Sequence, residues 1–280
     1  MDVLSHLFHY FPFRTDLFFI GRLCHLTQFE TQNKGHLHII RQGSCLLKVK
    51  NQPVQRIDYP CIVFISSEIS HHIHPLNDEL DIFCISFDFG EGINNPLTHT
   101  IQNIVTLQLH SHPELDTITS LIYEETEKMA LGYASTIHHL CAYLTLRVVR
   151  CCLEEKHIKV GLLKGLTDKQ LSGVLLEIHE KPEYNWQVDI LAKKASMSRS
   201  RFASYFKQII GMSPIDYITH WRITLAQTLL LKGLPIMLIA DRVGYSHNES
   251  FTRAFSRIVG QSPIEWFKLQ QEKIKVADNK

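Results

Sequence analysis

Apolar residues gather in short runs over the first third of the chain. Between residues 17 and 88, segments such as "HLHII", "CIVFIS" and "LDIFCISFDF" are rich in β-branched and aromatic residues. Turn formers such as the "NQP" at 51–53 separate some of these segments. Short strands at hairpin-like spacing are typical of a β-barrel or a β-sandwich. The pattern therefore predicts a β domain of one of these two kinds.

The pattern changes to a helical period over residues 113–157. An apolar seam repeats there at steps of four and three residues, the spacing of a helix that packs against another helix. The seam consists of Ile137, Cys141, Leu144, Val148 and Cys151. Two interpretations are open: the seam is a contact inside the chain, or it joins two copies of the chain as a dimer.

One short pattern occurs twice near the C-terminal end, as "GMSPIDY" at 211–217 and "GQSPIEW" at 260–266. Gly suits the left-handed residue just past a helix, Ser caps the next helix, and Pro is tolerated in its first turn. Asp216 and Glu265 follow the capping Ser by three residues, where a carboxylate can accept from the free amides of that turn. Each motif thus predicts the end of one helix and the start of another.

The repeat extends upstream of both motifs. Phe202 and Phe206 in the first copy match Phe251 and Phe255 in the second. Each copy shows a short helix, a tight turn that ends in Ser198 or Ser246, and a second helix, which is the helix-turn-helix arrangement. The second helix of such a unit can enter the major groove of DNA. A solenoid is the alternative, but solenoids need three or more units and only two are present.

The helical period separates the packed face of each second helix from its outer face. The inward residues are Phe202, Phe206 and Ile209, and Phe251, Phe255 and Ile258; the outward residues are Ser200, Ser204 and Lys207, and Glu249, Arg253 and Ser256. The segment 213–232 between the units predicts a helix of about 20 residues, or roughly 30 Å. Successive major grooves on one face of DNA lie about 34 Å apart. One stiff helix could therefore present both second helices to adjacent turns of one duplex.

Charge divides the chain unevenly. The 280 residues, long enough for about two domains, carry a net charge of +1. Residues 183–280 hold 14 Lys and Arg against 8 Asp and Glu, a net of +6, which leaves −5 for the rest. A basic domain favours polyanionic partners such as DNA. The alternative is a solvated lysine-bearing face with no partner.

Cysteines and the first residues bear on the compartment. All seven Cys, an odd number, lie in the first 152 residues with no CxxC pair, which indicates neither a zinc finger nor a regular disulfide framework and predicts reduced thiols. The start "MDVLSHLFHYFPF" lacks a basic leader region, and no apolar run approaches the roughly 18 residues of a membrane span. We therefore expect a cytoplasmic protein.

Residues 166–270 resemble the DNA-binding domain of the AraC/XylS transcriptional regulators, in the pattern "W…DILA…A.MSRSRF…FK…G.SP..Y…R…A…LL…I..IA..VGY…SF.RAF.R..G.SP..W". The resemblance implies two helix-turn-helix subdomains joined by a central helix. It implies base contacts from Ser200, Ala203 and Ser204 in the first recognition helix and from Asn248, Glu249, Ser250 and Arg253 in the second. It implies backbone contacts from Arg199, Arg201 and Thr252, and we add Lys207 and His247 as candidates. Because the first helix has only small residues at its base-facing positions, that helix is expected mainly to orient the protein.

The N-terminal part is similar to the cupin-type sensor domain of many such regulators. In "GHLHIIRQG", His36 and His38 alternate on a strand and so point the same way, and His71 follows on a later strand. Cupin metal sites resemble this set, but Gln42 stands near the place of the usual Glu. A divalent metal at these histidines is therefore a hypothesis. The alternative is that they face a pocket or form hydrogen bonds in loops.

A second hypothesis for the signal rests on thiols. Cys24 and Cys84 are both expected on strands of the sensor domain, and some relatives of this architecture are similar in detecting oxidants with cysteines. Buried, inert Cys is the alternative, since free Cys is among the most buried residue types. A small apolar or aromatic ligand in the barrel is a third candidate for the signal.

The sequence therefore predicts an α+β protein in five parts: a cupin-like β-barrel sensor domain at 1–112, a helical dimerisation region at 113–157, a linker at 158–166, an all-α double helix-turn-helix domain at 167–270 and a tail at 271–280. The predicted function is a homodimeric transcriptional regulator that binds promoter DNA and acts with RNA polymerase. The alternative is a cupin-type metalloenzyme with an appended nucleic-acid-binding domain. Gln42 counts against the enzyme, and the sequence has no Gly-rich phosphate loop, nucleophile elbow or HExxH motif.

Overall fold

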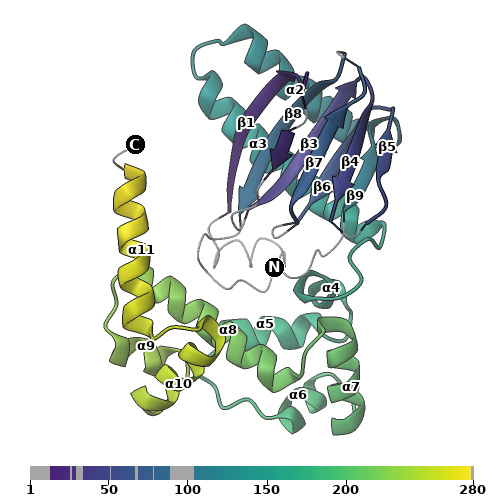
Figure 1. Cartoon of the computed structure of the whole chain (residues 1–280). Helices are drawn as coiled ribbons and strands as arrows, with labels where there is room; N and C mark the ends of the chain where they lie inside the picture. The colour runs from purple at the N-terminus through teal and green to yellow at the C-terminus, as the bar shows by residue number, and fades with distance from the viewer. Residues whose placement is uncertain are drawn as a thin grey trace. The chain divides into compact units, whose positions relative to one another are not determined.

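The computed structural model of the protein describes residues 13–25, 27–29, 34–50, 52–66, 69–77, 79–88 and 104–278. Contacts between Cα atoms divide the described residues into two compact units, with the division between residues 157 and 158 (Figure 1). The first unit holds the strands and two long helices, and the second unit is helical. This confirms the predicted α+β class.

Two antiparallel sheets form the first unit. One has the strand order β1-β8-β3-β6-β9 and the other the order β2-β7-β4-β5. The strands are β1 (Arg14–Arg22), β2 (Thr27–Phe29), β3 (Gly35–Gln42), β4 (Cys45–Val49), β5 (Gln55–Ile57), β6 (Cys61–Ile65), β7 (His71–Pro75), β8 (Asp81–Asp88) and β9 (Val105–Gln108). Strand β3 lies at the centre of the larger sheet, and its first six residues are all buried. Apolar side chains of both sheets, among them Ile40, Leu47 and Ile73, share one core.

Two helices complete the first unit, after a single 3-10 turn at Leu109–Ser111. They are α2 (Pro113–Lys128) and α3 (Tyr133–Glu154), and α3 packs against both α2 and β1. The five residues of the predicted apolar seam are all buried in these contacts. The interpretation as an internal contact is therefore confirmed, and the interpretation as a dimer seam is wrong for these residues. Spacing alone could not decide this, because a helix and a sheet of the same chain bury a seam as well as a second copy does.

The predicted linker at 158–166 is partly helical. Helix α4 (Leu162–Thr167) buries Leu162, Leu163 and Leu166, and it packs on α5 (Ser172–Glu180) and α7 (Arg199–Ile210) of the second unit. The amide of Gly161 also donates to the carbonyl of Ile209 at 2.8 Å. The short run "GLLKGL" shows no clear period because it spans little more than one turn. Its leucines make it part of the core rather than a free connection.

Seven further helices follow in the second unit, with α8 at its centre. They are α5 (Ser172–Glu180), α6 (Val188–Lys194), α7 (Arg199–Ile210), α8 (Pro214–Leu231), α9 (Ile236–Arg242), α10 (Asn248–Val259) and α11 (Pro263–Asp278). Helices α7, α9, α10 and α11 all pack against α8. The predicted tail from residue 271 is instead the second half of α11, which has no helix-breaking residue before Asp278.

Both Gly-x-Ser-Pro motifs form the predicted helix ends. Gly211 follows α7 with a φ of 92°, and Gly260 follows α10 with a φ of 82°. The hydroxyl of Ser213 accepts from the amide of Asp216, and that of Ser262 accepts from the amide of Glu265. The Glu265 carboxylate accepts in return from the Ser262 amide at 3.0 Å. These local bonds fix where α8 and α11 begin.

Among the helices that the structure describes, none combines the length and the apolar character that a membrane span requires.

Candidate nucleic-acid interface

The first helix-turn-helix unit consists of α6, a turn at 195–198, and α7. Ser196 adopts a φ of 54° in the turn, and the hydroxyl of Ser198 accepts from the Arg201 amide to start α7. Phe202 and Phe206 are fully buried, as predicted, and their rings lie 5.5 Å apart. The inner face of α7 is thereby fixed to the core. The last turn buries Ile210 rather than the predicted Ile209, which is only half-buried.

The outer face of α7 carries the candidate contact residues. Arg199, Ser200, Arg201, Ser204 and Lys207 are exposed, and Ala203 is half-buried. Ser200, Ser204 and Lys207 lie along one side of the helix, roughly opposite the two phenylalanines, and Arg199 and Arg201 flank its first turn. The side chain of Arg199 also forms an exposed ion pair with Asp189 of α6 at 3.4 Å. An exposed pair of this kind is weak, so a phosphate can compete for this arginine.

The second helix-turn-helix unit repeats this geometry with α9 and α10. Gly244 opens the turn with a φ of 82°, and α10 begins after His247. The N-cap is therefore His247 rather than the Ser246 at which the sequence places the end of the turn, because this turn is one residue longer than the first. Phe251 and Phe255 are fully buried and share a core with Trp266.

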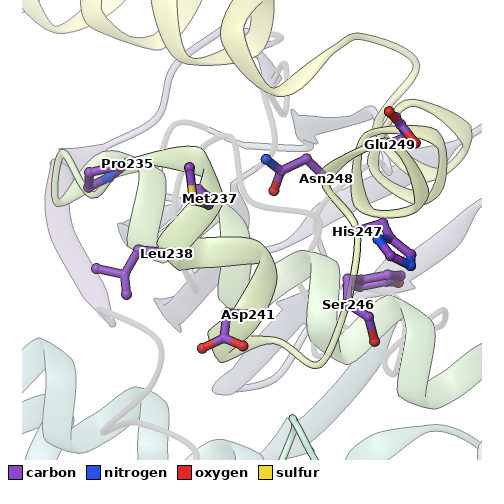
Figure 2. A pocket seen from close by; sticks show the side chains of 9 residues that line it. Pro235, Met237, Leu238, Asp241, Ser246, His247, Asn248 and Glu249 are labelled. Carbon is purple, nitrogen blue, oxygen red and sulfur yellow. The ribbon is translucent and has the colours of Figure 1, made fainter.

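Candidate residues of α10 surround an open groove at the start of the helix. Met237, Leu238 and Asp241 of α9 line the groove together with His247, Asn248 and Glu249 (Figure 2). The groove has a volume of about 750 Å³. His247, Asn248, Glu249 and Arg253 are exposed, and Ser250 and Thr252 are half-buried. The Arg253 guanidinium lies 3.5 Å from the Ser250 hydroxyl. This end of α10 therefore offers an amide, a carboxylate and a guanidinium, the groups that contact adenine, cytosine and guanine edges in the major groove.

Both helix-turn-helix units pack against the same helix, α8. Figure 1 shows α6 and α7 at one end of α8, and α9 and α10 at the other. All these helices belong to one compact unit, so α8 holds the two outer faces at a set separation.

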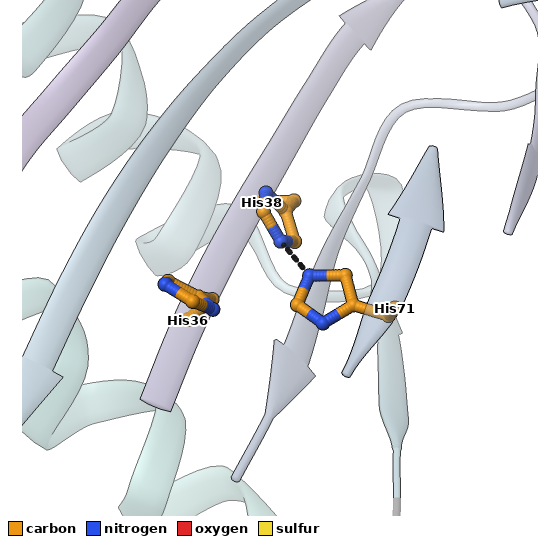
Figure 3. Close-up of side chains that lie close together, drawn as sticks. All are labelled: His36, His38 and His71. Carbon is orange, nitrogen blue, oxygen red and sulfur yellow. Dashed lines mark hydrogen bonds between the residues drawn. The ribbon is translucent and has the colours of Figure 1, made fainter. Parts of the chain in front are cut away.

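A second candidate site lies between the two sheets of the first unit. His36 and His38 of β3 meet His71 of β7, and one ring nitrogen from each lies within 4.8 Å of the other two (Figure 3). All three side chains are buried. Burial lowers the pKa of His36 to about 4 and lowers the pKa values of His38 and His71. The three imidazoles are therefore neutral at neutral pH and can act as ligands.

The hydrogen bonds of this cluster define its tautomers. The Nδ1 atom of His71 lies 2.9 Å from the carbonyl of Ile69, which can only accept, so we assign the proton to Nδ1. The bare Nε2 of His71 then accepts from Nε2 of His38 at 2.7 Å. The remaining Nδ1 of His38 accepts from the thiol of Cys84 at 3.0 Å. Cys84 thus belongs to the histidine cluster, because β3 and β8 pair with His38 directly opposite Cys84.

The two predicted thiol positions differ. Cys84 lies on β8 as predicted, fully buried, and burial raises its pKa. Cys24 is exposed and follows the end of β1, so its predicted place on a strand is wrong. Phe19 pairs with Cys84, and Cys24 follows five residues later, which is about 16 Å of extended chain. A disulfide between them would need the strands to rearrange, since bridged Cα atoms lie within about 7 Å.

Comparisons with known proteins identify both units. A helix-turn-helix domain family matches residues 191–269, and a cupin family matches residues 2–154. An AraC-like transcription regulator of Streptomyces lividans is 33% identical over 86% of this chain and 89% of its own. An HTH-type transcriptional regulator of Haemophilus influenzae is 27% identical over 96% of this chain and 99% of its own. The regulator MtrA of Neisseria gonorrhoeae is 30% identical over 68% of this chain and 63% of its own.

The fold and the paired helix-turn-helix units define a DNA-binding transcriptional regulator with a cupin domain. The chain belongs to the AraC family of transcriptional regulators. Its relatives are named as transcriptional regulators, which agrees with the predicted regulator rather than with the alternative of a metalloenzyme.

Two functional features escape prediction from the sequence. The contact of Cys84 with the histidines depends on strand register, which no local pattern reveals. Arg222 of α8 contacts both the loop that leads into the first helix-turn-helix unit and the turn of the second, but the sequence pattern that includes it indicates no role for it. The one signal in the sequence was that Arg222 lies on the helix predicted to join the two helix-turn-helix units.

Proposed function

We propose that α7 and α10 enter successive major grooves of one promoter duplex, on one face of the DNA. The observation that carries this proposal is the arrangement of the two units: each buries a pair of phenylalanines and leaves a polar outer face, and both pack on α8. The net charge of +6 over 183–280 adds attraction for the phosphates.

The two helices have different tasks in this proposal. Helix α7 presents arginine and lysine beside small residues, which suits phosphate contacts that position the protein. Helix α10 presents Asn248, Glu249 and Arg253, which can pair with base edges. Sequence specificity therefore comes mainly from α10.

Footprinting tests this arrangement. A duplex selected by the full chain from genomic fragments is probed with hydroxyl radicals and with a guanine-N7 methylating agent. We expect two protected patches about 10 base pairs apart on one face, with guanine N7 protected in the patch that α10 contacts. A single patch, or two patches on opposite faces, would refute the proposal.

We propose in addition that the histidine cluster holds a metal ion. The residues fit one: His71 Nδ1 is held by the Ile69 carbonyl, which leaves Nε2 as the ligand atom. Gln42 is exposed, so the carboxylate of related metal sites has no counterpart there. Three imidazoles beside a thiol favour a borderline metal such as Zn²⁺ over Mg²⁺ or Ca²⁺. His36, His38 and His71 would hold the ion, with the His38 proton on Nδ1 instead of Nε2, and a bound ion would link β3 to β7.

Metal analysis tests the cluster. The full chain is loaded with Zn²⁺, dialysed and analysed for metal, and the expected content is about one ion per chain. His71→Ala should lose the ion. His72→Ala is the matched control, because the neighbouring side chain points to the other face of β7; it should keep the ion. A wild-type chain without bound zinc, or an His71→Ala chain that retains it, would contradict the proposal.

The signal and the assembly are proposals as well. We propose that the first unit senses an effector and that oxidation of Cys24, the exposed thiol, is one such signal. Oxidant should then change DNA affinity in the wild type and not in Cys24→Ser.

Because the apolar seam of α3 is used internally, a homodimer would use the outer face of that helix, where Tyr143 is 52% exposed. Tyr143→Glu should lower the mass measured by light scattering if this face joins two copies. At a promoter in the cytoplasm, the partner of such a regulator is RNA polymerase.

A further inference from the structure

The side chain of Arg222 binds the backbone of two loops, one that leads into the first helix-turn-helix unit and one that is the turn of the second. Its Nε donates to the carbonyl of Pro182 at 2.8 Å, and one Nη donates to the carbonyl of Tyr184 at 2.9 Å. The other Nη donates to the carbonyl of Gly244 at 3.2 Å. The guanidinium also lies over the ring of Tyr245, 5.6 Å from its centre. One half-buried side chain on α8 thus makes four contacts with two loops far apart in sequence.

One loop precedes the first helix-turn-helix unit, and the other is part of the second. Residues 182–184 connect α5 to α6 and lead into the first unit, whereas Gly244 and Tyr245 form the turn between α9 and α10. The loops also touch directly. A Cβ at Gly244 would lie 2.8 Å from the Cα of Glu183 and 2.7 Å from the Arg222 guanidinium. The turn of the second helix-turn-helix unit therefore lies against the loop that leads into the first, and Arg222 contacts both.

We propose that Arg222 is the positioning residue that fixes the second recognition helix relative to the first. The length of α8 sets the distance between the two helix-turn-helix units. It controls poorly how each of these units is rotated around the axis of α8. Three hydrogen bonds from one rigid guanidinium fix three points on two loops. The register between α7 and α10 then depends on Arg222 and on the close approach at Gly244. This inference rests on the proposed function, in which both helices contact one duplex.

Changing the spacing of the DNA site measures that register. The probe is the selected duplex, with 2 or 5 base pairs inserted between its two protected patches. An insertion of 5 base pairs turns the second patch to the opposite face of the DNA, since about 10.5 base pairs make one turn. For the wild-type chain, we expect this insertion to weaken binding by about 100-fold, because the second contact is lost. Arg222→Ala should bind the original duplex about tenfold more weakly and lose less than about threefold on insertion.

Companion variants separate positioning from unfolding. Lys232→Ala removes a positive charge from the end of the same helix, where the side chain is exposed, and should keep the wild-type dependence on spacing. Arg222→Lys keeps the charge but not the three-point geometry and should fall between wild type and Arg222→Ala. Gly244→Ala pushes the same loops apart from the other side and should relax the spacing dependence too. Circular dichroism melting shows which variants are folded, and if Arg222→Ala is not, the lysine and Gly244 variants decide.

The outcomes distinguish this inference from the proposed function. If the folded Arg222 and Gly244 variants show the full wild-type loss on insertion, the positioning role is refuted while the two-groove proposal stands. If the wild-type chain itself is indifferent to spacing, the two-groove proposal fails first.

Discussion

Replacing Arg253 by alanine tests whether α10 contacts bases or only the DNA backbone. The side chain is exposed on the outer face of α10, one turn beyond Glu249, and its guanidinium makes a long hydrogen bond to the Ser250 hydroxyl at 3.5 Å. Because this side chain lies outside the folded core, the free energy of unfolding should change by less than about 0.5 kcal/mol. Any loss of DNA binding can then be assigned to the interface.

The size and salt dependence of the loss distinguish the two kinds of contact. A bidentate bond to guanine is worth about 1 to 3 kcal/mol of discrimination, so Arg253→Ala should weaken specific binding by roughly 5- to 150-fold and leave nonspecific binding nearly unchanged. A phosphate contact would instead weaken binding to all sequences and reduce the slope of log K against log salt by about 0.9. Fluorescence anisotropy with the selected duplex and a scrambled duplex, at several KCl concentrations, measures both effects.

The control for this experiment is Arg150→Ala, which removes an exposed arginine from α3, outside the helix-turn-helix units. It should bind like the wild type. If Arg253→Ala binds both duplexes as the wild type does at every salt concentration, Arg253 contacts neither bases nor phosphates, and the placement of α10 in the major groove loses its main support.

Three predictions concern stability and pH. Phe206→Ala should lower the free energy of unfolding by about 3 to 5 kcal/mol in urea titrations, because a fully buried ring leaves a cavity; a loss below about 1 kcal/mol would contradict this packing. Gly211→Ala should cost about 1 to 2 kcal/mol by the same measurement, since its φ is 92°; an unchanged midpoint would show that the helix end differs. Partial burial lowers the pKa of His112, but bonds to the Gln108 carbonyl and the Glu155 carboxylate outweigh burial and raise it, whereas the bond from His112 lowers the pKa of Glu155. The pair should therefore add about 0.5 kcal/mol between roughly pH 4.5 and 6.5, reduced by its partial exposure, and lose it as the pH rises through the raised pKa of His112. His112→Gln should flatten the melting temperature between pH 5.5 and 8, and an equal slope in both chains would exclude this role.

The sequence alone determined the features that depend on near neighbours in the chain. Glycine at the left-handed helix ends, serine at the caps and phenylalanine at every fourth residue act over a few positions, so the residue pattern was enough to locate the two helix-turn-helix units. The β-rich character of residues 17–88 followed in the same way from the residue types in each run. Backbone conformation and helical period are local properties, which is why these predictions were confirmed.

Tertiary structure decided the features that join distant residues. The apolar seam of α3 was correctly found, but its partner was not, because burial against α2 and β1 and burial against a second copy require the same spacing. Cys84 joins His38 only through the register of β3 and β8, and a shift of one residue would turn that thiol to the other face. Arg222 bonds to residues 40 and 22 positions away, which only the packing of two loops against α8 brings within its reach. The chain thus encodes its DNA-binding units locally, whereas their mutual register and the histidine cluster arise from contacts that form only when the whole chain is folded.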